Sequence, residues 1–142
     1  MTVLHSTRHK NKTIAALLAF LLGGLGMQRL YLRGWRDPWL WLHLSSLPAA
    51  WLVAQLAPQA DGFYKLLPVT LSGLAGMLQA LILGLTPDDK WDARYNAASA
   101  RQSDTRWPLA VVLVASMMVG AGGLIATISR LFDLLYTGGA YG

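Results

Sequence analysis

Long hydrophobic runs alternate with short polar stretches along this chain. Four apolar segments, at about residues 13–28, 38–57, 66–85 and 108–129, make up most of the 142 residues. A helix that crosses a membrane needs roughly 20 mainly apolar residues. The pattern therefore predicts an all-α, polytopic membrane helical bundle. Three segments are expected to cross fully, and the short N-terminal hydrophobic helix is either re-entrant or a fourth crossing.

Glycines and prolines divide these segments. Glycines within residues 23–26 weaken the end of the first segment. Pro48 lies inside the second segment and predicts a kink there, and the third helix is expected to begin near Pro68. Thr86, followed by proline and two aspartates, predicts the N-cap of a short amphipathic helix. We expect one membrane domain over 1–142, with a helical pair at 10–57. A helical hairpin at 58–142 would carry an amphipathic cytoplasmic loop at 86–107.

Composition agrees with a membrane protein. Hydrophobic residues are 54% of the chain and charged residues 13%, against about 25% charged in typical soluble domains. Cysteine and glutamate are absent, so disulfides and thiolate metal sites are excluded. The formal charge of +5 fits basic loops held on the cytoplasmic side better than nucleic-acid binding.

The basic residues bear on topology. If the first segment turns back, every lysine and arginine except Lys65 and Arg130 lies on one side of the membrane. Four full crossings would divide them almost evenly. The positive-inside rule favours the re-entrant arrangement. Both arrangements place loops 29–37 and 86–107 in the cytoplasm and the C-terminus outside, and they differ on the N-terminal tail.

The beginning of the chain carries a family pattern. Residues 10–12 read Lys-Asn-Lys, an apolar run follows, and residues 23–34 form a glycine-rich turn. This stretch resembles the TM-two domain family, called NINE in bacteria, whose turn has the form G-x-H-R-F-Y-L-G. Gln28 and Leu30 depart from that form. The matching family-turn positions are Gly26, Arg29, Tyr31 and Leu32.

A second stretch resembles the same family. Residues 88–96, ending in Tyr95-Asn96, are similar to an element that follows the helices in bacterial members. The resemblance covers residues 10–57 well and 86–96 loosely. It implies a multi-pass protein of the bacterial inner membrane, and it implies little mechanism because bacterial members have no agreed activity.

Three arginines follow the first segment. Arg33 and Arg36 lie beside tryptophans, where they would contact anionic lipid or an acidic partner. The simpler interpretation is that they act only as topological anchors. Arg29 is expected to be structural, bonding glycine carbonyls left exposed at the end of the first helix.

Polar and small residues mark the remaining segments. His43 is an intramembrane polar residue, and a neutral histidine bonded across a helix interface is favoured over a metal or proton site. Gln55 and Gln79 are candidates for bonds between helices. Small residues recur every fourth position in the third segment, at Ser72, Gly76, Ala80 and Gly84, and predict close helix packing within the chain or between protomers. Ser116, Gly120, Gly123 and Thr127 form a second such surface in the fourth segment.

Catalytic patterns are not found in the sequence. It has no nucleophile elbow, phosphate loop or metal-ligand spacing, so no catalytic, cofactor-binding or metal residue is predicted. The favoured function is a non-enzymatic helix-packing or interaction module that associates with itself or with another membrane protein. The alternatives are a transport, channel or lipid-handling protein, or a membrane-permeabilising effector.

Overall fold

A computed structural model describes residues 8–141. The predicted location of the N-terminal tail therefore falls partly outside the described residues, at 1–7. The elements in chain order are α1 (Lys12–Leu22), η1 (Gly23–Leu25), α2 (Met27–Arg33), η2 (Gly34–Arg36), α3 (Pro38–Leu44), α4 (Ser46–Leu56), α5 (Gly62–Leu85), α6 (Asp88–Tyr95) and α7 (Trp107–Thr137). No strand occurs among the described residues, so the all-α prediction is confirmed.

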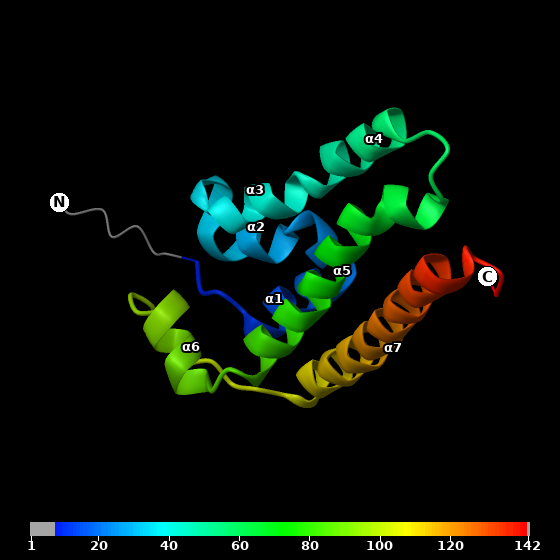
Figure 1. Ribbon diagram of the computed structural model, residues 1–142. Coiled ribbons are helices and arrows are strands. Elements are labelled where there is room, and N and C mark those ends of the chain that lie inside the picture. The colour runs from blue at the N-terminus through cyan, green and yellow to red at the C-terminus, as the bar shows by residue number, and fades with distance from the viewer. Residues whose placement is uncertain (1–7, 142) are drawn as a thin grey trace.

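Two helices are long and apolar enough to cross a membrane. They are α5, with 24 residues, and α7, with 31 residues, and they run side by side (Figure 1). Only 11% of the most apolar window of either helix is buried, whereas a core helix of a soluble protein would be mostly buried. Their exposed leucine, isoleucine and methionine side chains require an apolar solvent. The molecule is therefore a membrane protein.

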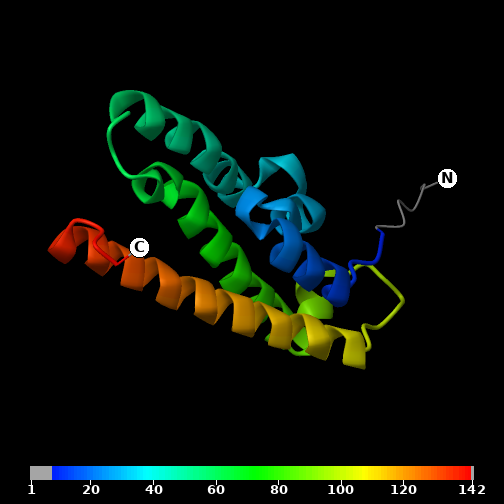
Figure 2. The same cartoon turned by 90° about the vertical axis from the view of Figure 1, so that its right-hand side faces the viewer.

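The first hydrophobic segment turns back on itself. Lys12, at the start of α1, bonds the carbonyl of Thr86 at the end of α5, with 2.8 Å between Nζ and O. The other end of α1 reaches only Gly76, midway along α5. After η1 the chain returns through α2, where the Tyr31 hydroxyl accepts a bond from the Asn11 amide at 2.8 Å. α1 is ~16 Å long and α5 ~36 Å at 1.5 Å per residue, so this hairpin covers about half of α5 (Figure 2).

The hairpin rests on α5 through two glycines. A Cβ added to Gly76 would lie 2.5 Å from the carbonyl carbon of Gly23, and one added to Gly23 would lie 2.6 Å from Cα of Gly76. No side chain fits between two backbones at that separation. The contact therefore requires glycine on both partners.

The second segment is interrupted at Ser45, three residues before Pro48. α3 ends at Leu44, and Pro48 falls in the first turn of α4. Proline lacks an amide hydrogen and clashes with the carbonyl four residues earlier, which here belongs to Leu44. A break between the two helices places Pro48 where neither effect matters. The Ser45 hydroxyl then satisfies the carbonyl of Leu42, at 2.7 Å.

One predicted helix start and one predicted helix cap are wrong. α5 begins at Gly62, not near Pro68, because the Asp61 carboxylate caps it by accepting from the Phe63 amide at 2.8 Å. Thr86 does not cap α6, because its hydroxyl donates to the carbonyl of Ile82 in α5, at 2.7 Å.

The fourth segment also continues farther than its apolar part. α7 extends past residue 129 because Arg130 pairs with Asp133 one turn later, with 2.6 Å between the charged atoms. Arg130 also lies 3.2 Å from Asp61. This pairing holds the C-terminal end of α7 beside the start of α5.

The two glycines at 73 and 76 provide a matched test of the hairpin contact. We expect Gly76→Ala to lower the free energy of unfolding by about 1–3 kcal/mol, because the added methyl overpacks the interface. Gly73→Ala should leave stability unchanged or raise it, since a Cβ at Gly73 meets nothing within 4 Å and alanine favours helix. Thermal unfolding in mild detergent measures both. Equal stability of the two variants would contradict the close contact.

Candidate functional site

The family turn places a glycine against the second segment. Gly26 has a φ of +73°, and a Cβ there would lie 3.1 Å from both the His43 Cβ and the Leu40 Cδ1. Its backbone conformation and its surroundings therefore both require glycine. This turn brings α2 back between α1 and α3.

Polar side chains from three elements meet beside this turn and form the buried polar cluster, which consists of Gln28, Arg29, Asp37, His43, Ser72 and Gln79. The Ser72 hydroxyl donates to the Gly24 carbonyl at 2.7 Å, so its oxygen accepts the proton of His43 Nδ1, also at 2.7 Å. His43 Nε2 then accepts from the Gln79 amide at 2.9 Å. This pattern fixes a neutral imidazole with its proton on Nδ1. His43 bonds across a helix interface, as we expected from the sequence.

Gln79 connects the histidine to the arginine. Its Oε1 accepts from Gln28 Nε2 at 2.7 Å and from Arg29 Nε at 2.9 Å. The Arg29 guanidinium also lies 3.8 Å from the buried carboxylate of Asp37 and 5.9 Å from the ring centre of Trp39. Arg29 therefore ties α2 to both α5 and α3.

The predicted hydrogen-bond partners of Arg29 are not the ones that the structure shows. We predicted bonds to the glycine carbonyls at the end of the first helix, but Ser72 satisfies the carbonyl of Gly24 instead. Ser72 lies one helical turn before Gly76 on the same face of α5 and reaches that carbonyl directly. The guanidinium bonds Gln79 instead, which the sequence marks as a candidate for bonds between helices but does not pair with Arg29.

The small-residue stripe of α5 lies on the buried side of the helix. Ser72 and Gly76 contact the α1–η1 hairpin, and Ala80 is fully buried. A Cβ at Gly84 would lie 2.4 Å from Leu113 of α7. All four positions are therefore used within the chain. The second surface is used in the same way: Ser116 is buried, and a Cβ at Gly120 would be 3.0 Å from that of Met77.

Other candidates lie outside the cluster. Arg33 and Arg36 are exposed at the end of the bundle that carries α6, and Gln55 is exposed on α4. Tyr31 and Leu32 are half-buried on α2. Among residues 8–141, no group of three or more histidines and acids lies close enough together to hold a metal ion.

A second polar assembly, the N-terminal latch, joins residues 9–12 to α2 and α6. The Asn96 side chain accepts from the Lys10 amide at 2.6 Å and donates to the Lys10 carbonyl at 3.1 Å. Trp91 Nε1 donates to the same carbonyl at 3.0 Å, and Lys10 Nζ donates to the Tyr31 carbonyl at 2.7 Å. The two stretches that resemble one family in the sequence are thus in direct contact.

Acidic groups of α6 complete the latch. Lys12, which is almost fully buried, forms an ion pair with Asp88, and its hydrogen bond, followed by that of Thr105, holds the pKa of Asp88 below its ordinary value. Hydrogen bonds from Asn96 and then from Ser103 lower the pKa of Asp92 to about 2. Both carboxylates are therefore charged at neutral pH and fix the 96–106 segment beside α6.

The fold and its exposed apolar helices define a helical membrane protein. Residues 8–56 match the model of the TM2 domain family, so the N-terminal part of the chain is a TM2 domain. This confirms the resemblance of residues 10–34. No curated protein and no solved structure matches the chain. The matched region ends with α4, while α5 supplies Ser72, Gly76 and Gln79 to its packing and to the polar cluster.

Arg29 and Arg33 can be compared directly. Arg29→Lys should lower the free energy of unfolding by about 1–3 kcal/mol, because an ammonium group cannot reproduce the fork that reaches Gln79 and approaches Asp37. Arg33→Lys should change little, since Arg33 is exposed. Melting temperatures in mild detergent test both. A larger loss for Arg33→Lys would show that the roles are reversed.

Proposed function

We propose that three segments cross the membrane fully: α3 together with α4, then α5, then α7. α3 and α4 have 7 and 11 residues and extend ~28 Å together, close to the roughly 30 Å of a hydrocarbon core. The α1–η1–α2 hairpin is a re-entrant element. Non-helical backbone at membrane depth requires protein contacts, and the bond from Ser72 to the Gly24 carbonyl supplies one.

The latch supports a cytoplasmic N-terminus. Hydrogen bonds join residues 9–12 to Tyr31, Trp91 and Asn96, so these segments share one end of the bundle. The arginines of loop 29–37 and the basic residues of 86–107 are at this end. The positive-inside rule makes it cytoplasmic. The bacterial inner membrane is the proposed location, because residues 88–96 resemble the bacterial form of the family.

We further propose that the protein is a non-enzymatic interaction module that associates with a second copy of itself. The observation that carries this proposal is the outer face of α7, the interaction face, made of Met118, Gly122, Ile125, Ser129 and Phe132. All five are exposed. They recur at alternating steps of four and three residues, with large and small side chains in turn.

Alternating steps of four and three residues are the spacing of contact positions between two paired helices. Apolar positions repeating every 3.5 residues form a continuous seam, and small residues between large ones receive the knobs of a facing helix. The pattern is complementary to itself, so a second copy in the same membrane orientation is its simplest partner. The small residues of α5 are already buried within the chain, which leaves α7 as the available surface.

The buried polar cluster favours a structural role over catalysis or transport. Both ring nitrogens of His43 bond side chains of the same chain. Gln79 uses its carbonyl oxygen and its amide in the same cluster. His43 and Gln79 therefore have their hydrogen-bond partners within the chain, although Gln28 Oε1 and Asp37 Oδ2 accept no hydrogen bond among the described residues.

Gly122→Leu tests the association. We expect it to lower the dimer fraction at least about tenfold, because a leucine fills the space that must receive a large residue of the partner. The monomer should fold normally, since a Cβ at Gly122 meets nothing within 4 Å. Sedimentation or single-molecule counting in lipid nanodiscs measures the dimer fraction.

Gly73→Leu is the matched control, because it makes the same substitution in an apolar helix at a position where an added Cβ also meets nothing within 4 Å. It should leave the dimer fraction unchanged. A monomeric parent protein, or an equal effect of the two leucines, would refute association through α7.

A further inference from the structure

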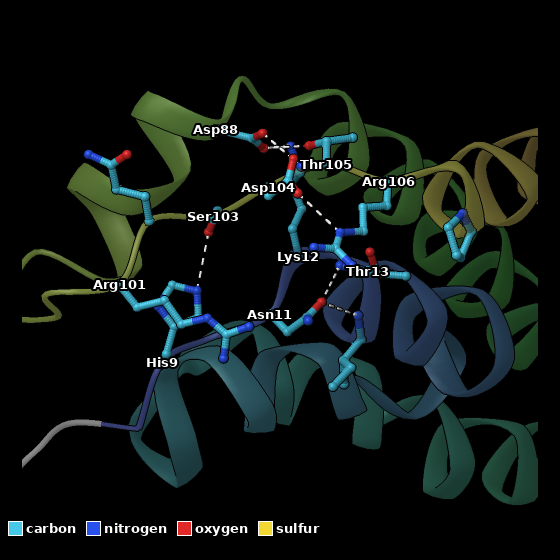
Figure 3. A pocket seen from close by; sticks show the side chains of 13 residues that line it. His9, Asn11, Lys12, Thr13, Asp88, Arg101, Ser103, Asp104, Thr105 and Arg106 are labelled. Atoms are coloured by element: carbon cyan, nitrogen blue, oxygen red, sulfur yellow. Dashed lines mark hydrogen bonds and ion pairs between the residues drawn. The ribbon is translucent and has the colours of Figure 1, made fainter.

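A cavity of about 340 Å³ lies at the end of the bundle that carries the latch (Figure 3). Segment 9–14, which leads into α1, forms one wall, and segment 101–106, which leads into α7, forms another. Asp88 and Pro108 complete the lining. The cavity therefore lies where two apolar helices begin, at the boundary between the polar end of the molecule and its lipid-facing part.

The charges around this cavity do not cancel. Lys12 is paired with Asp88, and Arg106 Nε lies 3.0 Å from the carboxylate of Asp104. Among residues 8–141, the guanidinium of Arg101 takes part in no ion pair or hydrogen bond. Counting its lysine, arginine and aspartate side chains alone, the lining keeps one excess positive charge, which matches a ligand with one negative charge.

The donors are suited to a phosphate. Figure 3 shows the guanidinium groups of Arg101 and Arg106 turned toward the N-terminus of α1, near Asn11 and Thr13. Guanidinium groups bind phosphate oxygens through paired, charge-assisted hydrogen bonds. The positive end of the α1 dipole adds to the attraction for an anion.

An apolar track leads away from the same cavity. Ile14 belongs to its lining, and Ile14, Leu17 and Leu21 lie on one face of α1 at steps of three and four residues. Their exposed fractions are 46%, 40% and 63%, so this face is open along the length of the helix. A ligand that uses both features has a phosphate at one end and a hydrocarbon chain at the other.

We infer that this cavity binds the headgroup phosphate of an anionic phospholipid, whose chain lies along Ile14, Leu17 and Leu21. The net charge of a phosphodiester such as phosphatidylglycerol is opposite in sign to the excess charge of the lining and equal to it in magnitude. A zwitterionic lipid lacks that match, and free phosphate makes no use of the apolar track. The site is distinct from the interaction face of α7 and does not depend on it.

Native mass spectrometry of the full-length protein in detergent tests this site. The protein is titrated with phosphatidylglycerol and, separately, with phosphatidylcholine of the same chains. We expect one tightly retained phosphatidylglycerol per chain. Arg101→Gln should weaken its binding about tenfold, the effect of losing one charge-assisted contact. Arg33→Gln removes the same charge from a position that is exposed like Arg101 but does not line the cavity, and it should change binding less than about twofold. Equal weakening by the two variants, or equal retention of the two lipids, would overturn the assignment.

Ile14→Asn separates headgroup from chain. The variant should fold normally, because Ile14 is exposed, yet it should lose phosphatidylglycerol affinity. Inorganic phosphate at millimolar concentration should not displace the lipid from the parent protein. Displacement by inorganic phosphate would mean that the cavity binds free phosphate, and unchanged lipid affinity in Ile14→Asn would mean that the hydrocarbon chain does not lie along this face of α1. Either result would refute the lipid site.

Discussion

The contact between Gly23 and Gly76 is the constraint on which the rest of the structure depends. Either residue with a Cβ would place that atom within about 2.6 Å of the other backbone. Because the two backbones meet there, α1 ends halfway along α5 and the chain reverses through η1. The reversal sends α2 back to the latch and positions Gly26 and Arg29 against α3. A short hydrophobic helix thus becomes a hairpin packed on a longer one.

The close packing buries carbonyl groups that need hydrogen-bond donors, and the buried polar cluster supplies one such donor. The turn after α1 leaves carbonyl groups without helical partners, and Ser72 reaches one of them from the same face of α5 that carries Gly76. Ser72, His43, Gln79 and Arg29 then form one connected set of bonds. Water competes little for hydrogen bonds in such an environment. The connected bonds therefore rigidify the fold, and breaking one of them is costly. The cluster therefore specifies how α2, α3 and α5 fit together.

Hydropathy and glycine spacing predict much of this arrangement. They identify the helical class, the apolar segments, the weak end of the first helix and the small-residue stripe of α5, because each depends on local composition. The helix start at Gly62 depends on which polar residue supplies the cap, and a single sequence leaves that choice open. The partner of Arg29 depends on tertiary packing, since Gln79 is fifty positions away.

Two further features of the structure have a signal in the sequence. Gln28 replaces the usual residue of the family turn, and an amide there requires a buried partner such as Gln79. The alternation of large and small residues from Met118 to Phe132 is visible in the sequence, but the inner surface of α7 has a competing small-residue pattern. Only the packing of Gly120 and Gly123 against α5 separates the inner face from the outer one.

The central claim is that the first hydrophobic segment enters the bundle and returns to the end where it began. The natural chain contains no cysteine, so single cysteines can be placed at positions 7, 59 and 98 and labelled with an impermeant reagent. In intact cells, Gln59→Cys should be labelled, while Thr7→Cys and Ala98→Cys should react only after the membrane is permeabilised. Labelling of Thr7→Cys in intact cells, with Ala98→Cys still protected, would show that the segment crosses the membrane and would contradict this account.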